Sequence, residues 1–129
     1  MINSGHSQSQ VGSLPLVLKR VKLQTEFSCV PEEEKQQFEE ICLIIAEVFC
    51  LPSNFTVSIG KEKIPIILVR EIYNRLTKEH IDVVLQNFRR ATYEIRHKKT
   101  YFRTALYNVV FEFEGYYENQ VAKDLAKRS

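Results

Sequence analysis

Residues 31–50 read PEEEKQQFEEICLIIAEVFC, the pattern of an amphipathic helix with an acidic start. The glutamates at positions 32, 33 and 34 suit the positive end of a helix dipole. Pro52 follows closely and limits how far this helix extends. Apolar residues recur at steps of three and four, which places them on one buried face: Phe38, Ile41, Cys42, Ile45, Val48 and Phe49.

A short β-hairpin is predicted after this helix. Phe55, Val57 and Ile59 alternate with polar residues, which is the period of a half-buried strand. The residues that follow, 60–63, begin with glycine and are otherwise charged, which favours a tight turn. Residues 64–66 then form the returning strand, which Pro65 confines to an edge or ends.

Two helices are predicted between residues 67 and 95. The first covers residues 67–76 and carries Leu68, Ile72 and Leu76 on one face. Thr77 is a good N-cap for the second, because its hydroxyl accepts a hydrogen bond from a free backbone N–H group. The second helix has the clearest apolar stripe of the chain: Ile81, Val84, Leu85, Phe88, Thr92 and Ile95.

Two further helices are predicted beyond the polar residues 96–99, which interrupt this pattern. A last helix over residues 116–127 carries Tyr117, Val121 and Leu125 at four-residue spacing. The bulky and acidic residues 111–115 predict a connector before it. The other predicted helix lies before that connector. It is indicated by apolar residues that again recur at helical spacing: Tyr101, Phe102, Ala105, Leu106 and Val109.

The predicted fold class is therefore mainly α: a compact domain of about five helices with a small β-hairpin inserted after the first long helix. This helical domain is expected to cover residues 31–129. Residues 1–30 are expected to be a flexible tail or linker, because residues 2–12 are rich in Ser, Gln and Gly. Residues 14–23 alternate weakly around Pro15, which indicates either an extended docking segment or a disordered one.

Composition places the chain among ordinary folded proteins. Its 129 residues are 44% hydrophobic and 26% charged, which excludes a wholly disordered or disulfide-scaffold chain. No apolar run is longer than six residues, as in residues 64–69, which is far below the roughly 20 residues of a membrane-spanning helix. Residues 1–10 show no secretory signal, so a cytoplasmic location without membrane contact is expected. Cys29, Cys42 and Cys50 are interpreted as reduced thiols, mostly buried.

Catalytic and metal-binding patterns are missing from the sequence. Four glycines, two of them within residues 1–12, leave no phosphate-cradling loop, so nucleotide hydrolysis is not expected. His6, His80 and His97 lack the spacing of metal ligands. We interpret His80 as a polar residue at a helix start. No enzyme activity, metal or cofactor is expected.

Charge is divided along the chain. Residues 31–50 carry six glutamates against one lysine, a net charge of −5. Residues 89–103 carry six cations against one glutamate, a net charge of +5. Such a basic segment either contacts a polyanion or is simply a solvated face.

Proteins that bind DNA without reading bases need cations for the phosphates and flat side chains for stacking. The basic segment offers both. Phe88 and Phe102 fall on core stripes, so Tyr93 and Tyr101 remain as stacking candidates. The predicted DNA-binding residues are Arg89, Arg90, Tyr93, Arg96, Lys98, Lys99, Tyr101 and Arg103. In the other interpretation, Arg89 and Arg90 only favour the C-terminal dipole of their helix.

Several ordered blocks give the chain a resemblance to a known family. They are Ala46-Glu47-Val48-Phe49-Cys50, Phe55-Thr56-Val57-Ser58-Ile59-Gly60, residues 72–81, Val84-Leu85, Lys99-Thr100-Tyr101-Phe102, Ala105-Leu106-Tyr107-Asn108 and Tyr116-Tyr117. From Phe38 onward this order resembles the C-terminal domain of the plasmid replication initiator protein A family of Gram-positive plasmids and conjugative elements.

The segment Tyr101-Phe102-x-x-Ala105-Leu106-Tyr107 is also similar to a helix of the helicase-loader DnaD family. The resemblance implies a DnaD-like helical domain that contacts DNA non-specifically and recruits host replication proteins such as primase or helicase. It implies a role in replication initiation on plasmids or mobile elements. Where the initiator family has Asn-Ala-Pro, this chain has Asn108-Val109-Val110.

A second function remains open from the residues themselves. The chain could be a pure protein-interaction module without DNA binding. In that interpretation the acidic helix within residues 31–50, together with Tyr107, Tyr116 and Tyr117, forms the contact surface.

Overall fold

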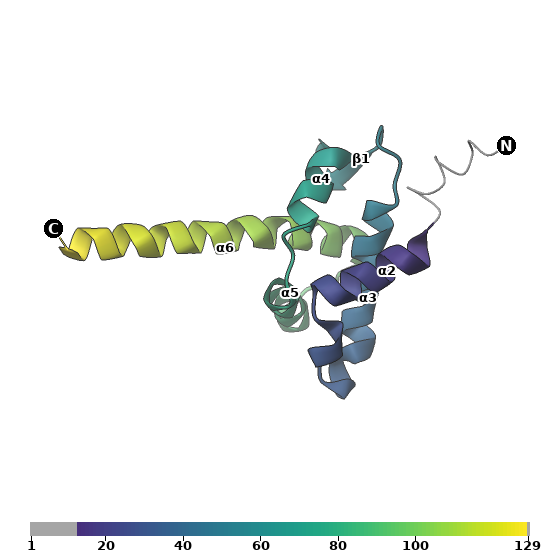
Figure 1. Ribbon diagram of the computed structural model, residues 1–129, viewed down its shortest axis with the longest axis horizontal. Coiled ribbons are helices and arrows are strands. Elements are labelled where there is room, and N and C mark those ends of the chain that lie inside the picture. The colour runs from purple at the N-terminus through teal and green to yellow at the C-terminus, as the bar shows by residue number, and fades with distance from the viewer. Residues whose placement is uncertain (1–12, 129) are drawn as a thin grey trace.

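The computed structural model describes the backbone of residues 13–128 and the side chains of residues 13–115 and 125–126. This part of the chain is mainly helical, with five α-helices and one antiparallel hairpin, so the predicted fold class is confirmed (Figure 1). The α-helices are α2 (Leu14–Gln24), α3 (Lys35–Phe49), α4 (Ile66–Tyr73), α5 (Lys78–Arg90) and α6 (Lys98–Arg128). The hairpin joins β1 (Thr56–Ile59) to β2 (Glu62–Pro65) between α3 and α4.

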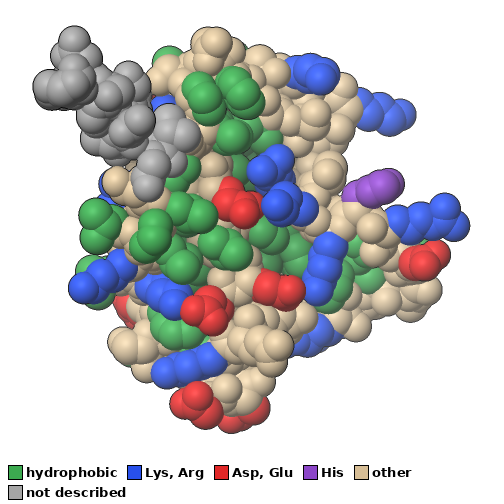
Figure 2. Space-filling view, turned by 90° about the vertical axis from the view of Figure 1, so that its right-hand side faces the viewer, with side chains coloured by type: hydrophobic (Ala, Val, Ile, Leu, Met, Phe, Trp, Pro, Cys, Tyr) green, Lys and Arg blue, Asp and Glu red, His purple; other side chains and the backbone are tan. Residues whose placement is uncertain are grey.

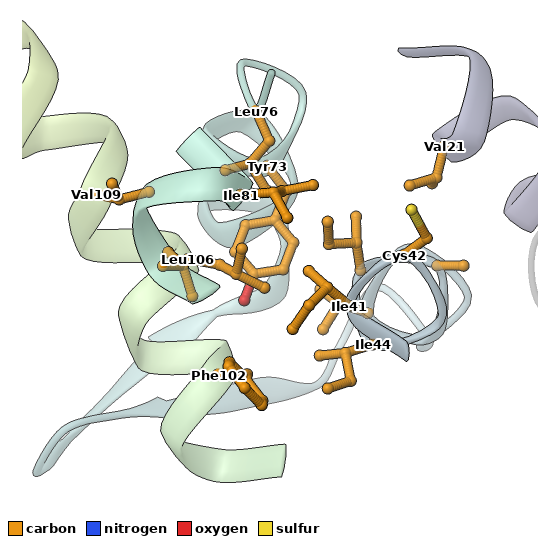
Figure 3. Packing of buried hydrophobic residues seen from close by; sticks show 14 of the residues in the cluster. Val21, Ile41, Cys42, Ile44, Tyr73, Leu76, Ile81, Phe102, Leu106 and Val109 are labelled. Carbon is orange, nitrogen blue, oxygen red and sulfur yellow. The ribbon is translucent and has the colours of Figure 1, made fainter. Parts of the chain in front are cut away.

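The core lies where α3, α4, α5 and the first half of α6 meet. Tyr73, at the end of α4, occupies its centre, and its hydroxyl is directed toward α6 (Figure 3). That hydroxyl donates a hydrogen bond of 2.8 Å to the carbonyl oxygen of Arg103. Burial raises the pKa of the Tyr73 hydroxyl far above its usual range, so the group stays a hydrogen-bond donor.

Helix α2 corrects the expectation for the N-terminal part of the chain. Residues 14–24, predicted to be extended or disordered, are helical and pack against α3, with Val21 fully buried. The Gln24 side-chain amide donates hydrogen bonds to the carbonyl oxygens of Tyr73 (3.0 Å) and Leu76 (2.9 Å). Pro15 lies in the first turn, where a missing N–H group costs no helical hydrogen bond. The expected flexible tail therefore does not include α2, and residues 1–12 lie outside the described residues.

Helix α3 confirms the prediction for residues 31–50. The three glutamates form the short 3-10 turn η2 (Glu32–Glu34), which leads directly into α3. Five of the six predicted stripe residues are buried, and Phe49 is partly buried. The ring of Phe49 packs edge-on against Tyr73 at a centroid distance of 6.5 Å.

The hairpin is confirmed, but its returning strand covers residues 62–65 and not 64–66, and Ile66 begins α4. Val57 pairs with Ile64, and Ile59 pairs with Glu62 across the turn. Gly60 has φ +62°, a left-handed conformation that residues with a Cβ rarely adopt. Its N–H group donates a hydrogen bond of 3.0 Å to the Thr104 hydroxyl, which ties the hairpin turn to α6.

Helices α4 and α5 differ from the predictions at their faces and ends. Val69, not Leu68, lies in the core, and Leu68 is 49% exposed. Helix α4 ends at Tyr73, short of the expected residue 76. Helix α5 has the predicted Thr77 N-cap but ends at Arg90, so Thr92 and Ile95 do not extend its stripe. Because Thr, Tyr and Ile are weaker helix formers than Leu or Arg, residues 92–95 support continuation poorly.

Helix α6 replaces the two predicted C-terminal helices. The expected connector 111–115 is helical, so α6 runs without a break over 31 residues and projects beyond the body of the domain (Figure 1). Gly115 is a poor helix former, but one glycine costs only about 1 kcal/mol and no proline is present to stop the helix. The side chains of Tyr117 and Val121 lie outside the described residues, and Leu125 is exposed. Within the described part of the chain, no helix has the length and apolar character needed to cross a bilayer.

The Tyr73 hydrogen bond gives a testable contribution to stability. We expect Tyr73→Phe to lower the free energy of unfolding by about 1 kcal/mol, because the Arg103 carbonyl keeps its helical N–H partner but loses the additional hydroxyl donor. Urea denaturation followed by circular dichroism measures this change, with Tyr107→Phe, at a partly buried tyrosine of α6, as the control. Equal stability of Tyr73→Phe and the wild type would contradict the proposed contribution.

The N-terminus of α5 predicts a pH dependence. The backbone N–H group of Thr77 donates to Nδ1 of His80 at 2.9 Å, and His80 is buried beside the Phe113 ring. Burial lowers the pKa of His80 below its ordinary value of 6.5, although the carboxylates of Glu79 and Glu114 oppose the shift. The unfolded chain therefore binds the proton more readily, and we expect stability to fall as the pH decreases below about 6.5.

Thermal or urea unfolding between pH 5 and 7.5 checks this pH dependence. In His80→Gln the amide oxygen can still accept from the Thr77 N–H group, but the side chain does not titrate. We expect the decrease in stability toward pH 5 to be smaller in this variant than in the wild type. Parallel pH profiles for the two proteins would contradict the assignment to His80.

Candidate nucleic-acid interface

The eight predicted DNA-binding residues lie at one junction of the fold. They come from the last turn of α5, the loop of residues 91–97 and the first two turns of α6. Helices α5 and α6 pack against each other, so the loop is held at a fixed corner of the domain. Six of the eight side chains are exposed and two are partly buried. The exposed residues are Arg89, Arg90, Tyr93, Arg96, Lys98 and Lys99.

Three aromatic rings form a cluster beneath this surface. Phe88 lies 4.8 Å from Phe102 and 5.8 Å from Tyr101, measured between ring centroids. Phe102 is fully buried and Phe88 partly buried, which confirms that both belong to the core. The Tyr101 ring packs edge-to-face with Phe102 at a centroid distance of 5.3 Å, so part of the Tyr101 surface is already covered.

Tyr93 is the available stacking residue of the predicted pair. Its side chain is 66% exposed, on the loop between α5 and α6. Burial raises the pKa of the Tyr101 hydroxyl, and the neighbouring Tyr93 adds to the shift. Tyr101 is partly buried, whereas the ring of Tyr93 is exposed to solvent.

The basic segment faces the acidic helix α3, a pairing that the charge pattern alone did not place. The Lys98 ammonium lies 3.4 Å from a Glu40 carboxylate oxygen, and Lys99 lies 3.1 Å from Glu47. The Lys98 ammonium also lies 5.6 Å from the centre of the Phe88 ring. On the face drawn in Figure 2, red acidic and blue basic side chains lie next to one another and do not form separate fields. Part of the +5 charge is therefore balanced within the domain.

The three arginines at the end of α5 and in the loop differ in their hydrogen-bond and ion-pair partners. Arg89 donates two hydrogen bonds to the Gln37 amide oxygen, at 2.8 and 3.1 Å, and this neutral partner leaves its charge unbalanced. Arg96 forms a solvent-exposed ion pair with Glu94 at 3.3 Å. Arg90 is exposed and has no ion-pair partner among the described residues. These arginines present positive charge to solvent at one corner.

Arg103 contributes less to this surface than the sequence predicted. Its side chain is partly buried, and its carbonyl oxygen accepts the Tyr73 hydrogen bond. The Arg103 Nε atom is buried without a hydrogen-bond partner in the described structure. The residue belongs as much to the core as to the basic surface.

Lys61 is a cation that the sequence analysis did not include. It follows Gly60 at the hairpin turn, and the hydrogen bond from Gly60 to Thr104 brings that turn against the start of α6. Lys61 is exposed. A lysine at a turn is a common solvated residue, and only the hydrogen bond from Gly60 to Thr104 shows that this turn lies against α6.

The other residues considered in the sequence as possible functional groups are His80 and the three cysteines. His80 completes the capping box of α5, as its interpretation as a helix-start residue required. Cys42 and Cys50 are buried, and burial raises the pKa of both thiols, whereas Cys29 is exposed. Across the residues with described positions, no three His, Cys, Asp or Glu side chains gather as a metal site would require.

These features define a mainly α-helical domain with an arginine-rich, partly self-neutralised corner between α5 and α6. The chain belongs to a family of unknown function, DUF6017, whose sequence model matches residues 7–128. No curated protein and no solved structure matches the chain.

Proposed function

We propose that this protein is a non-enzymatic accessory domain in DNA replication initiation on a plasmid or mobile element. It binds DNA without sequence specificity at the α5–α6 corner and recruits host replication proteins such as primase or helicase. The observation that carries the DNA-binding part is that Arg89, Arg90, Arg96 and Tyr93 are all exposed, at the end of α5 and in the short loop that joins it to α6. The resemblance to the replication initiator protein A and DnaD families supports the role in replication.

The chemistry of the corner favours phosphates and bases as ligands. Arginine guanidinium groups replace the counterions of a phosphate backbone, and an exposed tyrosine ring offers a stacking surface that every base can use. Contacts of this kind fix position but carry no base sequence information. Binding at this corner is therefore expected to be non-specific and strongly dependent on salt.

A pure protein-interaction module is the second candidate, and one observation favours it. Phe111 is 45% exposed on α6, and its ring lies 5.2 Å from that of Tyr107. Large exposed rings are common at the centres of protein interfaces. The same helix projects from the body, where a partner protein has access to it (Figure 1).

Fluorescence anisotropy with labelled single- and double-stranded oligonucleotides at several salt concentrations tests the DNA-binding proposal. We expect Arg89→Ala/Arg90→Ala/Arg96→Ala to weaken binding by about tenfold or more. The slope of log affinity against log salt should decrease by about 2, since each lost phosphate contact contributes about 0.7–0.9. A matched control, Lys19→Ala/Arg20→Ala/Arg75→Ala, removes three exposed cations from α2 and from the turn that follows α4.

Circular dichroism confirms that both triple variants fold. Equal weakening by the two variants, or no binding by the wild type at low salt, contradicts a DNA site at the α5–α6 corner. In that event, capture of a replication protein that is lost in Phe111→Ser but retained in the arginine variant supports the interaction module.

A further inference from the structure

The two ion pairs between α3 and α6 follow from the geometry of both helices. Glu40 and Glu47 are seven residues apart on α3, nearly two turns, so they lie on one side of that helix. Lys98 and Lys99 begin α6 and reach these two carboxylates at 3.4 and 3.1 Å. The four side chains surround a groove of about 270 Å³ with an apolar floor of Leu43, Ile44 and Phe102.

The two lysines of these pairs are accessible to a competitor, although the Glu47 Oε1 atom that meets Lys99 is itself buried. The side chains of Lys98 and Glu40 are 49% and 53% exposed, and those of Lys99 and Glu47 are 56% and 31% exposed. Exposed ion pairs contribute little to stability and are weakened by salt. A phosphate backbone carries a much denser row of negative charge than two carboxylates, and its binding also releases counterions.

We infer that Glu40 and Glu47 act as an internal substitute for nucleic-acid phosphates, keeping Lys98 and Lys99 occupied and thereby lowering the affinity of the α5–α6 corner for nucleic acid. This inference rests on the proposed DNA binding. The three arginines of the corner make the first contacts, because their charges face solvent. Lys98 and Lys99 join only when phosphates displace the two carboxylates.

Removal of the two carboxylate charges tests this competition. We expect Glu40→Gln/Glu47→Gln to bind single- or double-stranded oligonucleotides about three- to tenfold more tightly than the wild type, with a steeper salt dependence, because two weak ion pairs no longer compete. The control Glu33→Gln/Glu71→Gln removes two exposed carboxylates that have no ion pair within the described residues. It should increase affinity by less than about twofold, since distant exposed charges are screened.

Substitution of the two lysines completes a double-mutant cycle with the two glutamate changes. In the wild-type background, Lys98→Ala/Lys99→Ala should change affinity by less than about twofold, because the phosphate contacts of these lysines form at the expense of their ion pairs with Glu40 and Glu47. In the Glu40→Gln/Glu47→Gln background, the same lysine change should remove the gain. If the lysine change alters affinity by the same factor in both backgrounds, the inference is overturned. Because Glu47 is the less exposed carboxylate, Glu40→Gln alone serves if the double variant does not fold.

The outcomes separate this inference from the proposed function. Wild-type binding that depends on the three arginines, with Glu40→Gln/Glu47→Gln indistinguishable from its control, overturns only the competition. No binding by the wild type or by Glu40→Gln/Glu47→Gln at low salt overturns both. A gain that depends on Lys98 and Lys99 supports both.

Discussion

The hydroxyl of Tyr73 must keep a hydrogen-bond partner inside an apolar core, and this requirement connects four helices. The Tyr73 hydroxyl donates to the Arg103 carbonyl of α6, and the Tyr73 ring packs on Phe49 of α3. The backbone carbonyl of Tyr73 accepts a hydrogen bond from Gln24 of α2. A buried hydroxyl without a partner is costly, so α6 cannot slide along the end of α4 without loss of stability. The start of α6 is thereby fixed opposite the acidic side of α3.

That placement changes how the charge pattern is understood. Two segments of opposite net charge, separated by almost forty residues, meet in space through Lys98 and Lys99. Because all eight predicted site residues lie within residues 89–103, sequence reasoning could place them at one corner. It could not predict which cations have carboxylate partners, because Glu40 and Glu47 reach them only through the packing of α3 on α6.

The elements predicted best are those whose signals are local. Thr77 and the stripe from Ile81 to Leu85 identify α5, since an N-cap and a helical period need no distant contact. Helix α2 was missed because a single side chain, Val21, is buried completely and the anchoring bonds of Gln24 go to residues about fifty positions away. The break expected at residues 111–115 is absent because bulky and acidic residues tolerate a helix as well as a connector.

Helix α6 also sets a distance. A helix of 31 residues is about 46 Å long, at 1.5 Å per residue, so its outer end lies far from the corner where it begins. Two molecules held at opposite ends of α6 would not touch each other, yet their separation would be set by a rod and not by a flexible chain. With a partner at each end, α6 would act as a spacer, and its length in residues would determine the distance between the two partners.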